Sequence, residues 1–233
     1  MFADQRPPNR LLRLLPAADF EALQPHLQIA ELSRDSLLVE AGAALTHVYL
    51  PHSGIVSLVV SLSEGQAVEV AMIGRDGIVG AAEALGDGIS LTDAMVLCPG
   101  TASVLAIADF RMLAGQNVAF RNLLVRHEQA LLAQAEQSAA CNASHTVEQR
   151  LSCWLLRAHD LWDGPPLPMT QELLARMIGV QRNAVSIVAH ALQQARVLSY
   201  SRGQIEINDM KALLETSCEC YRSVKARQEK LLK

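Results

Sequence analysis

The sequence predicts an α+β protein with a β-rich N-terminal part, one long central helix and a C-terminal helix-turn-helix followed by a hairpin. Three observations predict this order. Short runs of Val, Ile, Leu, Tyr and Thr, separated by turn residues, occupy residues 36–107. Residues 117–143 contain neither Pro nor Gly and are rich in Ala, Leu, Gln and Glu. Residues 170–207 then contain two short amphipathic stretches joined at a Gly and an alternating segment around a second Gly.

Length and composition limit the class of protein. The chain has 233 residues, half of them apolar, which is enough for two small domains with separate cores. We expect a sensor domain over residues 1–116, a dimerisation helix over 117–145 and a DNA-binding domain over 146–233. The longest apolar runs, such as 55–62, are too short to cross a bilayer, and the N-terminus lacks a signal-peptide pattern. We therefore expect a cytoplasmic protein without membrane contact.

The β-rich region predicts an antiparallel barrel or sandwich. Its strands are separated by Gly, Pro, Asn, Asp and Ser, and no long helix alternates with them, which argues against a Rossmann-type sheet. The expected strands cover residues 37–40, 47–50, 55–60, 67–72 and 102–107.

The long central helix presents a candidate seam for a partner helix. The residues expected to form the dimer contact are Phe120, Leu123, Leu124, Leu131, Ala135 and Ala139. Polar residues at His127, Gln134 and Ser138 interrupt this seam. The alternative is that the helix packs only on its own barrel. A second helix is expected over 147–161, before the chain breaker at 163–166.

The segment from Thr170 to His190 meets several requirements of a helix-turn-helix together. Thr170 can cap the first helix, Ala175 is small where the second helix must approach, and Gly179 supplies the backbone freedom for the turn. Apolar residues suited to hold the two helices together are Leu174, Ile178, Val180, Val185 and Val188.

The second helix of this motif presents polar side chains suited to base edges or phosphates. They are Gln181, Arg182, Asn183, Ser186 and His190. We expect Arg182 to be the main base contact, because a guanidinium can donate two hydrogen bonds to guanine. The alternatives are that Arg182 contacts only phosphate and that His190 is a surface residue or a backbone contact. The alternating segment 197–207 predicts a hairpin, or wing, with Arg202 at its tip.

Charge is distributed unevenly along the chain. Residues 170–233 contain ten Lys or Arg and six Asp or Glu, whereas the rest contains ten against eighteen. A basic C-terminal region favours attraction to DNA phosphates in spite of the overall net charge of −4.

The five cysteines lack the spacing of a metal site. Cys98, Cys141 and Cys153 are scattered, and no C-x-x-C pair is present. Cys218 and Cys220 are expected on a final helix over residues 209–232, where positions i and i+2 point about 200° apart. We therefore expect buried, reduced thiols and no metal ligands.

With this order of parts, the chain resembles the Crp/Fnr family of bacterial regulators along nearly its whole length. The resemblance rests on residues 74–80 (GRDGIVG) and, more specifically, on residues 173–185 (LLARMIGVQRNAV). It implies a cyclic-nucleotide-binding-like β-roll, a long dimerisation helix and a C-terminal winged helix-turn-helix. It also implies a homodimer on double-stranded DNA at an inverted repeat, and RNA polymerase as a partner. Thr170 and Ile187 join the expected DNA contacts on this basis.

The effector region departs from the family pattern. Cyclic-nucleotide-binding members resemble one another in a Gly-Glu pair and a later Arg-Ser or Arg-Thr, whereas here Ala81 follows Gly80, and Thr92 and Asp93 stand near the second position. A buried phosphate without a cationic partner is costly, so we expect cAMP and cGMP to bind poorly. The first cysteine is Cys98, so an N-terminal iron-sulfur cluster is not expected either. The effector stays unknown.

Two other function classes are alternatives to a transcription regulator. A ligand-sensing signalling module could use its helix-turn-helix for a protein partner, and the salt dependence of DNA affinity would discriminate it. An enzyme is disfavoured, because no phosphate loop with Lys-Ser/Thr, no G-x-S-x-G and no H-E-x-x-H occurs.

Overall fold

A computed structural model describes residues 6–63, 66–164 and 166–231. The remaining residues, including the expected end of the last helix at Leu232, lie outside the described residues. Among the helices described, none has the length and apolar character needed to span a membrane.

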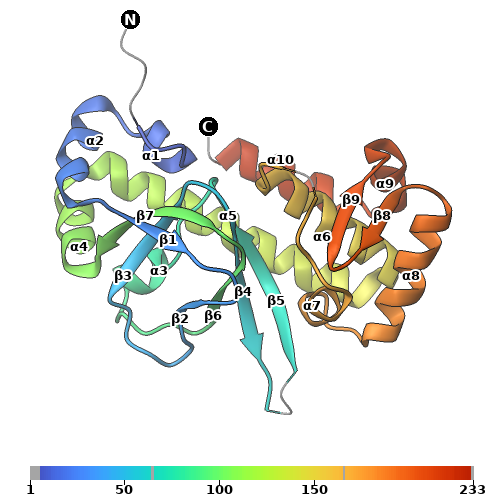
Figure 1. Ribbon diagram of the computed structural model, residues 1–233. Coiled ribbons are helices and arrows are strands. Elements are labelled where there is room, and N and C mark those ends of the chain that lie inside the picture. Colours follow the sequence, from blue (N-terminus) through green and yellow to red (C-terminus); the bar gives the residue numbers. More distant parts are fainter. Residues whose placement is uncertain (1–5, 64–65, 165, 232–233) are drawn as a thin grey trace, which may run out of the picture.

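The N-terminal half is a roll of two antiparallel sheets (Figure 1). One sheet has the strand order β1-β7-β3 and the other the order β2-β6-β4-β5. The strand bounds are β1 Gln28–Leu32, β2 Leu37–Val39, β3 His47–Pro51, β4 Ile55–Ser61, β5 Ala67–Ile73, β6 Asp93–Cys98 and β7 Gly100–Ala106. All five expected strands are present. Two strands were not expected from the sequence, namely β1, whose residues are mostly exposed, and β6, which only Pro99 separates from β7.

Short helices flank the roll and close its core. They are α1 Arg10–Leu14, α2 Ala17–Leu23, the 3-10 turn Gln24–His26, α3 Ala81–Leu85 and α4 Ile107–Gln116. The long helix α5, Val118–Ser144, is capped by Asn117, whose side-chain oxygen accepts from the Phe120 amide. Phe110 and Phe120 pack edge to face with ring centroids 5.6 Å apart, so the start of α5 belongs to the roll core.

The C-terminal half contains the expected helix-turn-helix and hairpin. Its elements are α6 Val147–Leu161, α7 Gln171–Met177, α8 Arg182–Gln194, β8 Leu198–Ser201, β9 Gln204–Ile207, α9 Met210–Thr216 and α10 Cys220–Leu231. A capping box formed by Thr146 and Gln149 starts α6 directly after α5 ends.

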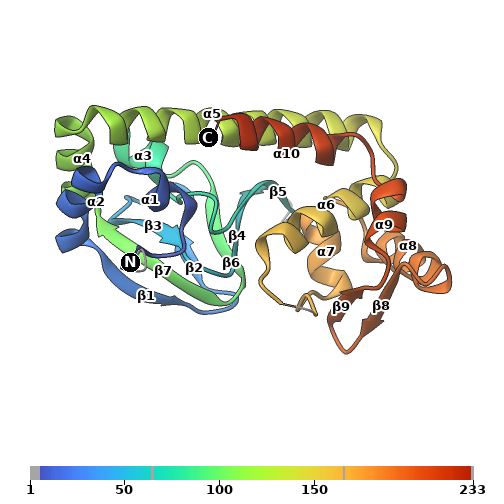
Figure 2. The same cartoon turned by 90° about the horizontal axis from the view of Figure 1, so that it is seen from above.

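The prediction of one continuous final helix was wrong, because the helix is interrupted between Thr216, the end of α9, and Cys220, the start of α10. The hydroxyls of Thr216 and Ser217 donate to the Leu213 and Leu214 carbonyls, both at 2.8 Å, and Ser217 has extended backbone angles. Ser and Thr hydroxyls that bind nearby backbone groups compete with a helix in this way. After the break, α10 lies along the C-terminal half of α5 (Figure 2).

The two halves share a hydrophobic core. Met72 and Leu97 of the roll and Trp154 and Leu174 of the C-terminal half belong to one buried cluster. Helix α7 packs against β5, the edge strand of the roll that faces the helix-turn-helix (Figure 1). The C-terminal domain is thus held on the sensor domain by packing as well as by the connecting helix.

Candidate functional site

The helix-turn-helix has the local geometry that its sequence predicts. The Thr170 hydroxyl accepts from the Leu173 amide at 3.1 Å and caps α7. Gly179 has φ +63°, a left-handed conformation that favours glycine, and forms the turn. The Val180 amide donates to the Ala175 carbonyl at 2.9 Å across the turn. Helix α8 then begins at Arg182.

The outer face of α8 is free to meet a ligand. Gln181, Asn183 and His190 are exposed, and Ile187 is 72% exposed. Arg182 is also exposed, and its Nε lies 3.9 Å from a carboxylate oxygen of Glu172. These five side chains therefore form one accessible surface at and beyond the start of α8.

Ser186 has a different environment from the other expected DNA contacts. It is half-buried, and its hydroxyl donates to Gln171 Oε1 at 2.6 Å. This bond joins α8 to the first residue of α7, so Ser186 holds the two helices in position.

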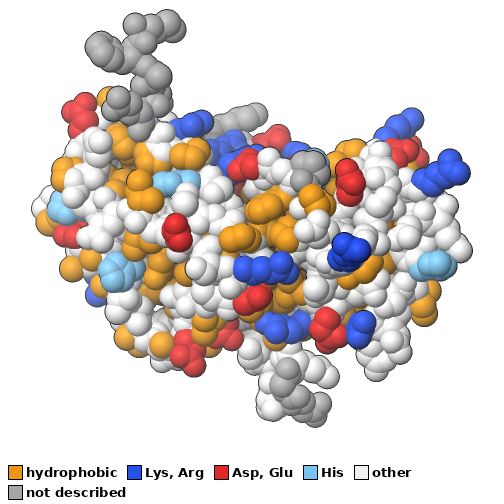
Figure 3. Space-filling view, in the orientation of Figure 1, with side chains coloured by type: hydrophobic (Ala, Val, Ile, Leu, Met, Phe, Trp, Pro, Cys, Tyr) orange, Lys and Arg blue, Asp and Glu red, His pale blue; other side chains and the backbone are white. Residues whose placement is uncertain are grey.

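The hairpin β8–β9 lies beside the motif as a wing. The Gln171 amide donates to the Tyr200 hydroxyl at 3.3 Å, which joins the wing to α7. Arg202 and Gly203 form the turn with positive φ angles of 50° and 74°, and Arg202 is exposed at the tip. In Figure 3, the side of the molecule with the C-terminal domain carries most of the Lys and Arg side chains in view.

The residues of the expected dimer seam occupy several environments. Phe120, Leu123 and Leu124 are buried in the core of their own roll, so they are inaccessible to a partner helix. Leu131 and Ala135 line a cavity in the same chain, and Ala139 is exposed.

A different face of α5 carries apolar side chains into solvent. Val118, Val125 and Leu132 are 59%, 49% and 60% exposed, and Ala139 follows at the same spacing of seven residues. Residues seven apart drift by only about 20° around a helix, so these four form one stripe.

A cavity of about 370 Å³ lies between the roll and α5. Three residues of the predicted effector region line it, namely Gly80, Ala81 and Thr92. Asp93 is not among the lining residues. Its carboxylate accepts from the Ala41 amide and the Ser61 hydroxyl, both at 2.9 Å, and so holds strands of the roll.

The cavity is apolar, and its charged groups are acidic. Glu83 and Glu128 line it, whereas no Lys, Arg or His does so within the described residues. Burial raises the pKa of Glu83, and the nearby Glu128 raises it further. The cavity therefore disfavours a phosphate group.

The segment 74–77 forms polar contacts between the two halves. Arg157 of α6 pairs with Asp76 at 2.7 Å, and both side chains are largely buried. Burial raises the pKa of Asp76, but the charge and hydrogen bond of Arg157 outweigh it and hold the pKa below its usual value. Arg75 pairs with Asp163 and donates to the Asp160 carbonyl. These contacts could not be predicted from the sequence, because the partners of this segment lie some 80 residues away along the chain.

Glu69 of β5 is a second contact that sequence reasoning missed. Its carboxylate accepts from Trp154 Nε1 of α6 at 2.9 Å and from the Ser57 hydroxyl of β4 at 2.6 Å. Burial raises the pKa of Glu69 to about 8, although these hydrogen bonds and Arg157 act to lower it. A carboxyl group with a raised pKa thus lies between the sensor and the C-terminal domain.

Two family models match the halves that the structure places side by side. Residues 29–117 match the cyclic nucleotide-binding domain, and residues 149–216 match the Crp-like helix-turn-helix domain. The chain belongs to the Crp/Fnr family. Its members are transcription regulators that combine these two domains, so α7 and α8 form the DNA-binding motif of a Crp/Fnr regulator.

Solved structures of Crp/Fnr regulators share the fold of this chain. FixK2 from Bradyrhizobium japonicum has a TM-score of 0.70 at 18% identity, over 82% of this chain and 98% of that one. A putative regulator of the family from Eubacterium rectale gives 0.68 at 14%, over 88% and 96%. CLP, the c-di-GMP responsive regulator of Xanthomonas campestris, gives 0.65 at 17%, over 82% and 99%. The search of curated proteins returned no match.

Proposed function

We propose that this Crp/Fnr regulator binds an inverted-repeat DNA site as a homodimer, with one α8 in the major groove of each half-site. The observation that carries the proposal is the exposed face of α8, where Arg182, Asn183 and His190 are free of the protein core. The wing tip at Arg202 would contact the adjacent backbone, and half-site centres would lie about 34 Å apart. RNA polymerase is the further partner that we propose at the promoter.

The two subunits would pair through the stripe Val118, Val125, Leu132 and Ala139 of α5. This stripe is apolar and exposed, and it follows the heptad spacing of a paired helix. A two-fold axis along α5 would bring the same stripe of both subunits together. This assignment replaces the seam expected from sequence, because three of that seam's residues lie in the roll core.

Arg182→Ala is expected to weaken operator binding by about tenfold to a hundredfold and to relax the preference at one base of each half-site. Loss of a bidentate contact to guanine costs about 1–3 kcal/mol. The operator would be found by selection from a random duplex pool at fixed salt, and affinities would be measured by fluorescence anisotropy.

The matched control for Arg182→Ala is Arg222→Ala, because Arg222 is an exposed arginine on α10. It should leave affinity unchanged. Equal losses in both variants would refute a base contact by Arg182, and a loss without change of base preference would reduce its role to phosphate binding. If the helix-turn-helix served only a protein partner, the association constant for DNA would not show the linear fall of its logarithm with the logarithm of the salt concentration.

We propose further that the effector is an uncharged or apolar molecule in the 370 Å³ cavity between the roll and α5. β5 contributes Val70, Ala71 and Ile73 to this cavity and also contacts α7. A ligand that moved β5 would therefore shift the balance between two arrangements of the DNA-binding domains.

Cyclic nucleotides are expected to give no saturable heat in calorimetry with this protein. Their phosphates would face Glu83 and Glu128 without a compensating cation. The same argument applies to c-di-GMP, to which the Xanthomonas relative responds. Micromolar binding of cAMP, cGMP or c-di-GMP would contradict this assignment of the cavity.

A further inference from the structure

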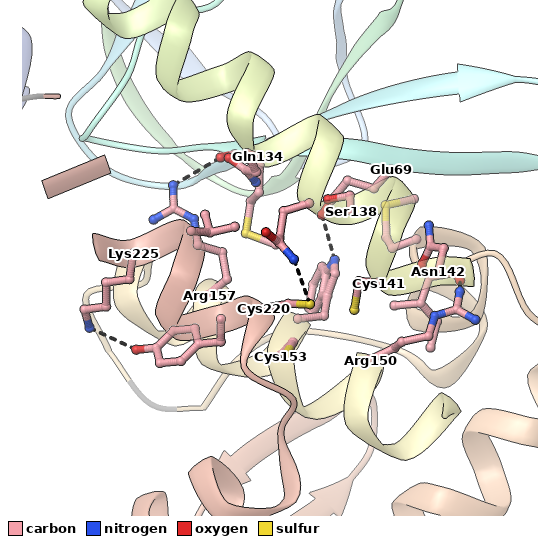
Figure 4. A pocket seen from close by; sticks show the side chains of 17 residues that line it. Glu69, Gln134, Ser138, Cys141, Asn142, Arg150, Cys153, Arg157, Cys220 and Lys225 are labelled. Atoms are coloured by element: carbon pink, nitrogen blue, oxygen red, sulfur yellow. Dashed lines mark hydrogen bonds between the residues drawn. The ribbon is translucent and has the colours of Figure 1, made fainter. Parts of the chain in front are cut away.

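Four sulfur- and nitrogen-bearing side chains meet at the hinge between the two halves. Cys141 and His145 lie at the end of α5, and Cys218 and Cys220 lie at the break between α9 and α10. One ligand atom from each lies within 4.8 Å of all the others. The side chains of Cys141 and Cys220 point toward one another beside Cys153 of α6 (Figure 4).

The helix break makes this meeting possible. On the continuous helix expected from the sequence, residues 218 and 220 would point to opposite sides. Because α10 starts only at Cys220, both sulfurs face the end of α5, and both cysteines are buried. The structure thus brings together thiols that are up to 79 residues apart in the sequence.

The separations of the donor atoms suit a tetrahedral metal ion. The Cys141 and Cys218 sulfurs lie 3.5 Å apart, as do the Cys220 sulfur and His145 Nδ1. Zinc bonds of about 2.3 Å to sulfur and 2.0–2.1 Å to nitrogen place tetrahedral ligands about 3.5–3.8 Å from one another. An iron-sulfur cluster would need a wider cage, because its own iron and sulfide atoms lie between the protein ligands.

Neighbouring groups support the same donor set. His145 Nε2 lies 3.4 Å from a carboxylate oxygen of Glu219, so the ring can donate there while Nδ1 faces the sulfurs. Histidines that bind a metal commonly donate their other ring proton to a carboxylate. Gln137 Nε2 also donates to the Cys220 sulfur at 3.1 Å, and such a bond stabilises a thiolate.

We propose that Cys141, His145, Cys218 and Cys220 bind one Zn²⁺ ion. On binding, each of the three thiols releases its proton to solvent, and neutral His145 binds through Nδ1. Cys153, whose sulfur lies 3.1 Å from that of Cys218, is then a hydrogen-bond partner of a ligand. The ion would fasten the start of α10 to the end of α5 and so fix the hinge between the sensor and the DNA-binding domain.

The test is metal binding by the full chain, purified in reductant, stripped with a chelator and titrated with Zn²⁺ and with Co²⁺. We expect about one ion per chain, a higher Tm with Zn²⁺, and the visible absorption of tetrahedral Co²⁺ with a thiolate charge-transfer band. Cys141→Ala and Cys220→Ala should lose the ion and the Co²⁺ spectrum.

Two cysteine variants serve as controls. Cys98→Ala removes a buried thiol at the end of β6 that lies outside the proposed metal site, and Cys153→Ala removes the neighbouring thiol. Both should keep the ion. The proposal is overturned if reduced wild type binds neither metal, if it carries iron and sulfide in place of zinc, or if Cys98→Ala or Cys153→Ala loses the ion as fully as Cys220→Ala. The titration of the wild-type protein by itself shows whether a metal ion binds, so the test does not depend on the folding of any variant.

Discussion

Val125→Glu is expected to convert the proposed dimer into a monomer and to weaken binding to the proposed inverted-repeat operator by about a hundredfold. Val125 lies in the middle of the exposed stripe on α5. In a symmetric pair of helices, the substitution would bring two carboxylates together in an apolar contact. A monomer binds each half-site separately and loses the gain of a linked second contact.

The measurements are sedimentation velocity and fluorescence anisotropy with full and half operators. Met112→Glu is the matched control, because Met112 is an apolar helical residue on α4 that is 41% exposed. It should remain dimeric and keep full affinity. A Val125→Glu protein that sediments as a dimer would place the subunit contact elsewhere on the molecule.

Glu69→Gln is expected to remove a fall in stability that wild type shows as pH rises from about 4.5 to about 8. The folded-state pKa of Glu69 is raised to about 8 from 4.5, so the folded protein holds a proton that the unfolded chain releases in this window. Stability therefore decreases with rising pH until Glu69 ionises in the folded state, and it is level above that. At about 1.4 kcal/mol per pKa unit, a rise from 4.5 to about 8 gives an effect on the order of 5 kcal/mol.

Other groups also titrate in this window, so the variant must be compared with wild type at each pH. Burial lowers the pKa of His52, which makes stability rise with pH below its ordinary value and partly masks the effect of Glu69. The difference between the two proteins isolates Glu69. Urea unfolding at fixed protein concentration from pH 5 to 9 gives this difference, with Gln gaining stability over Glu toward high pH.

Glu31→Gln, on the exposed face of β1, is the control and should follow wild type at every pH. A difference between Glu69→Gln and wild type that stays constant with pH would show that the carboxyl group does not titrate between the two domains. The hydrogen bond from Trp154 and the charge of Arg157, both from α6, favour the ionised form of Glu69, so the contact between β5 and α6 limits the rise in its pKa.

Local pattern was sufficient for the helix-turn-helix. Thr170 caps α7 and Gly179 turns the chain, as predicted, and α8 begins at Arg182, one residue after the expected start at about Gln181. Each of these roles depends on neighbours within a few residues, so the sequence contains all the information required. The same holds for the wing around Gly203 and for most strands of the roll, whose turn residues lie between runs of β-branched side chains.

The accessible face of α5 could not be read from its sequence. Phe120, Leu123 and Leu124 are as apolar as a dimer seam requires, but the roll buries them. The spacing of apolar residues shows that a helix has an apolar face, but it does not show whether the same chain or a partner covers that face. Only the position of the roll left Val118, Val125 and Leu132 for a partner.

By itself, the sequence determined the order of the domains, the helix-turn-helix with its exposed polar face, and the absence of an arginine from the effector region. Only the tertiary structure decided which cysteines meet, which charges line the cavity, and that Glu69 lies between β5 and α6. The physical reason is distance along the chain. Caps, turns and helical faces depend on residues within one or two turns, whereas a metal cage or a raised pKa depends on groups that the fold brings together from segments far apart.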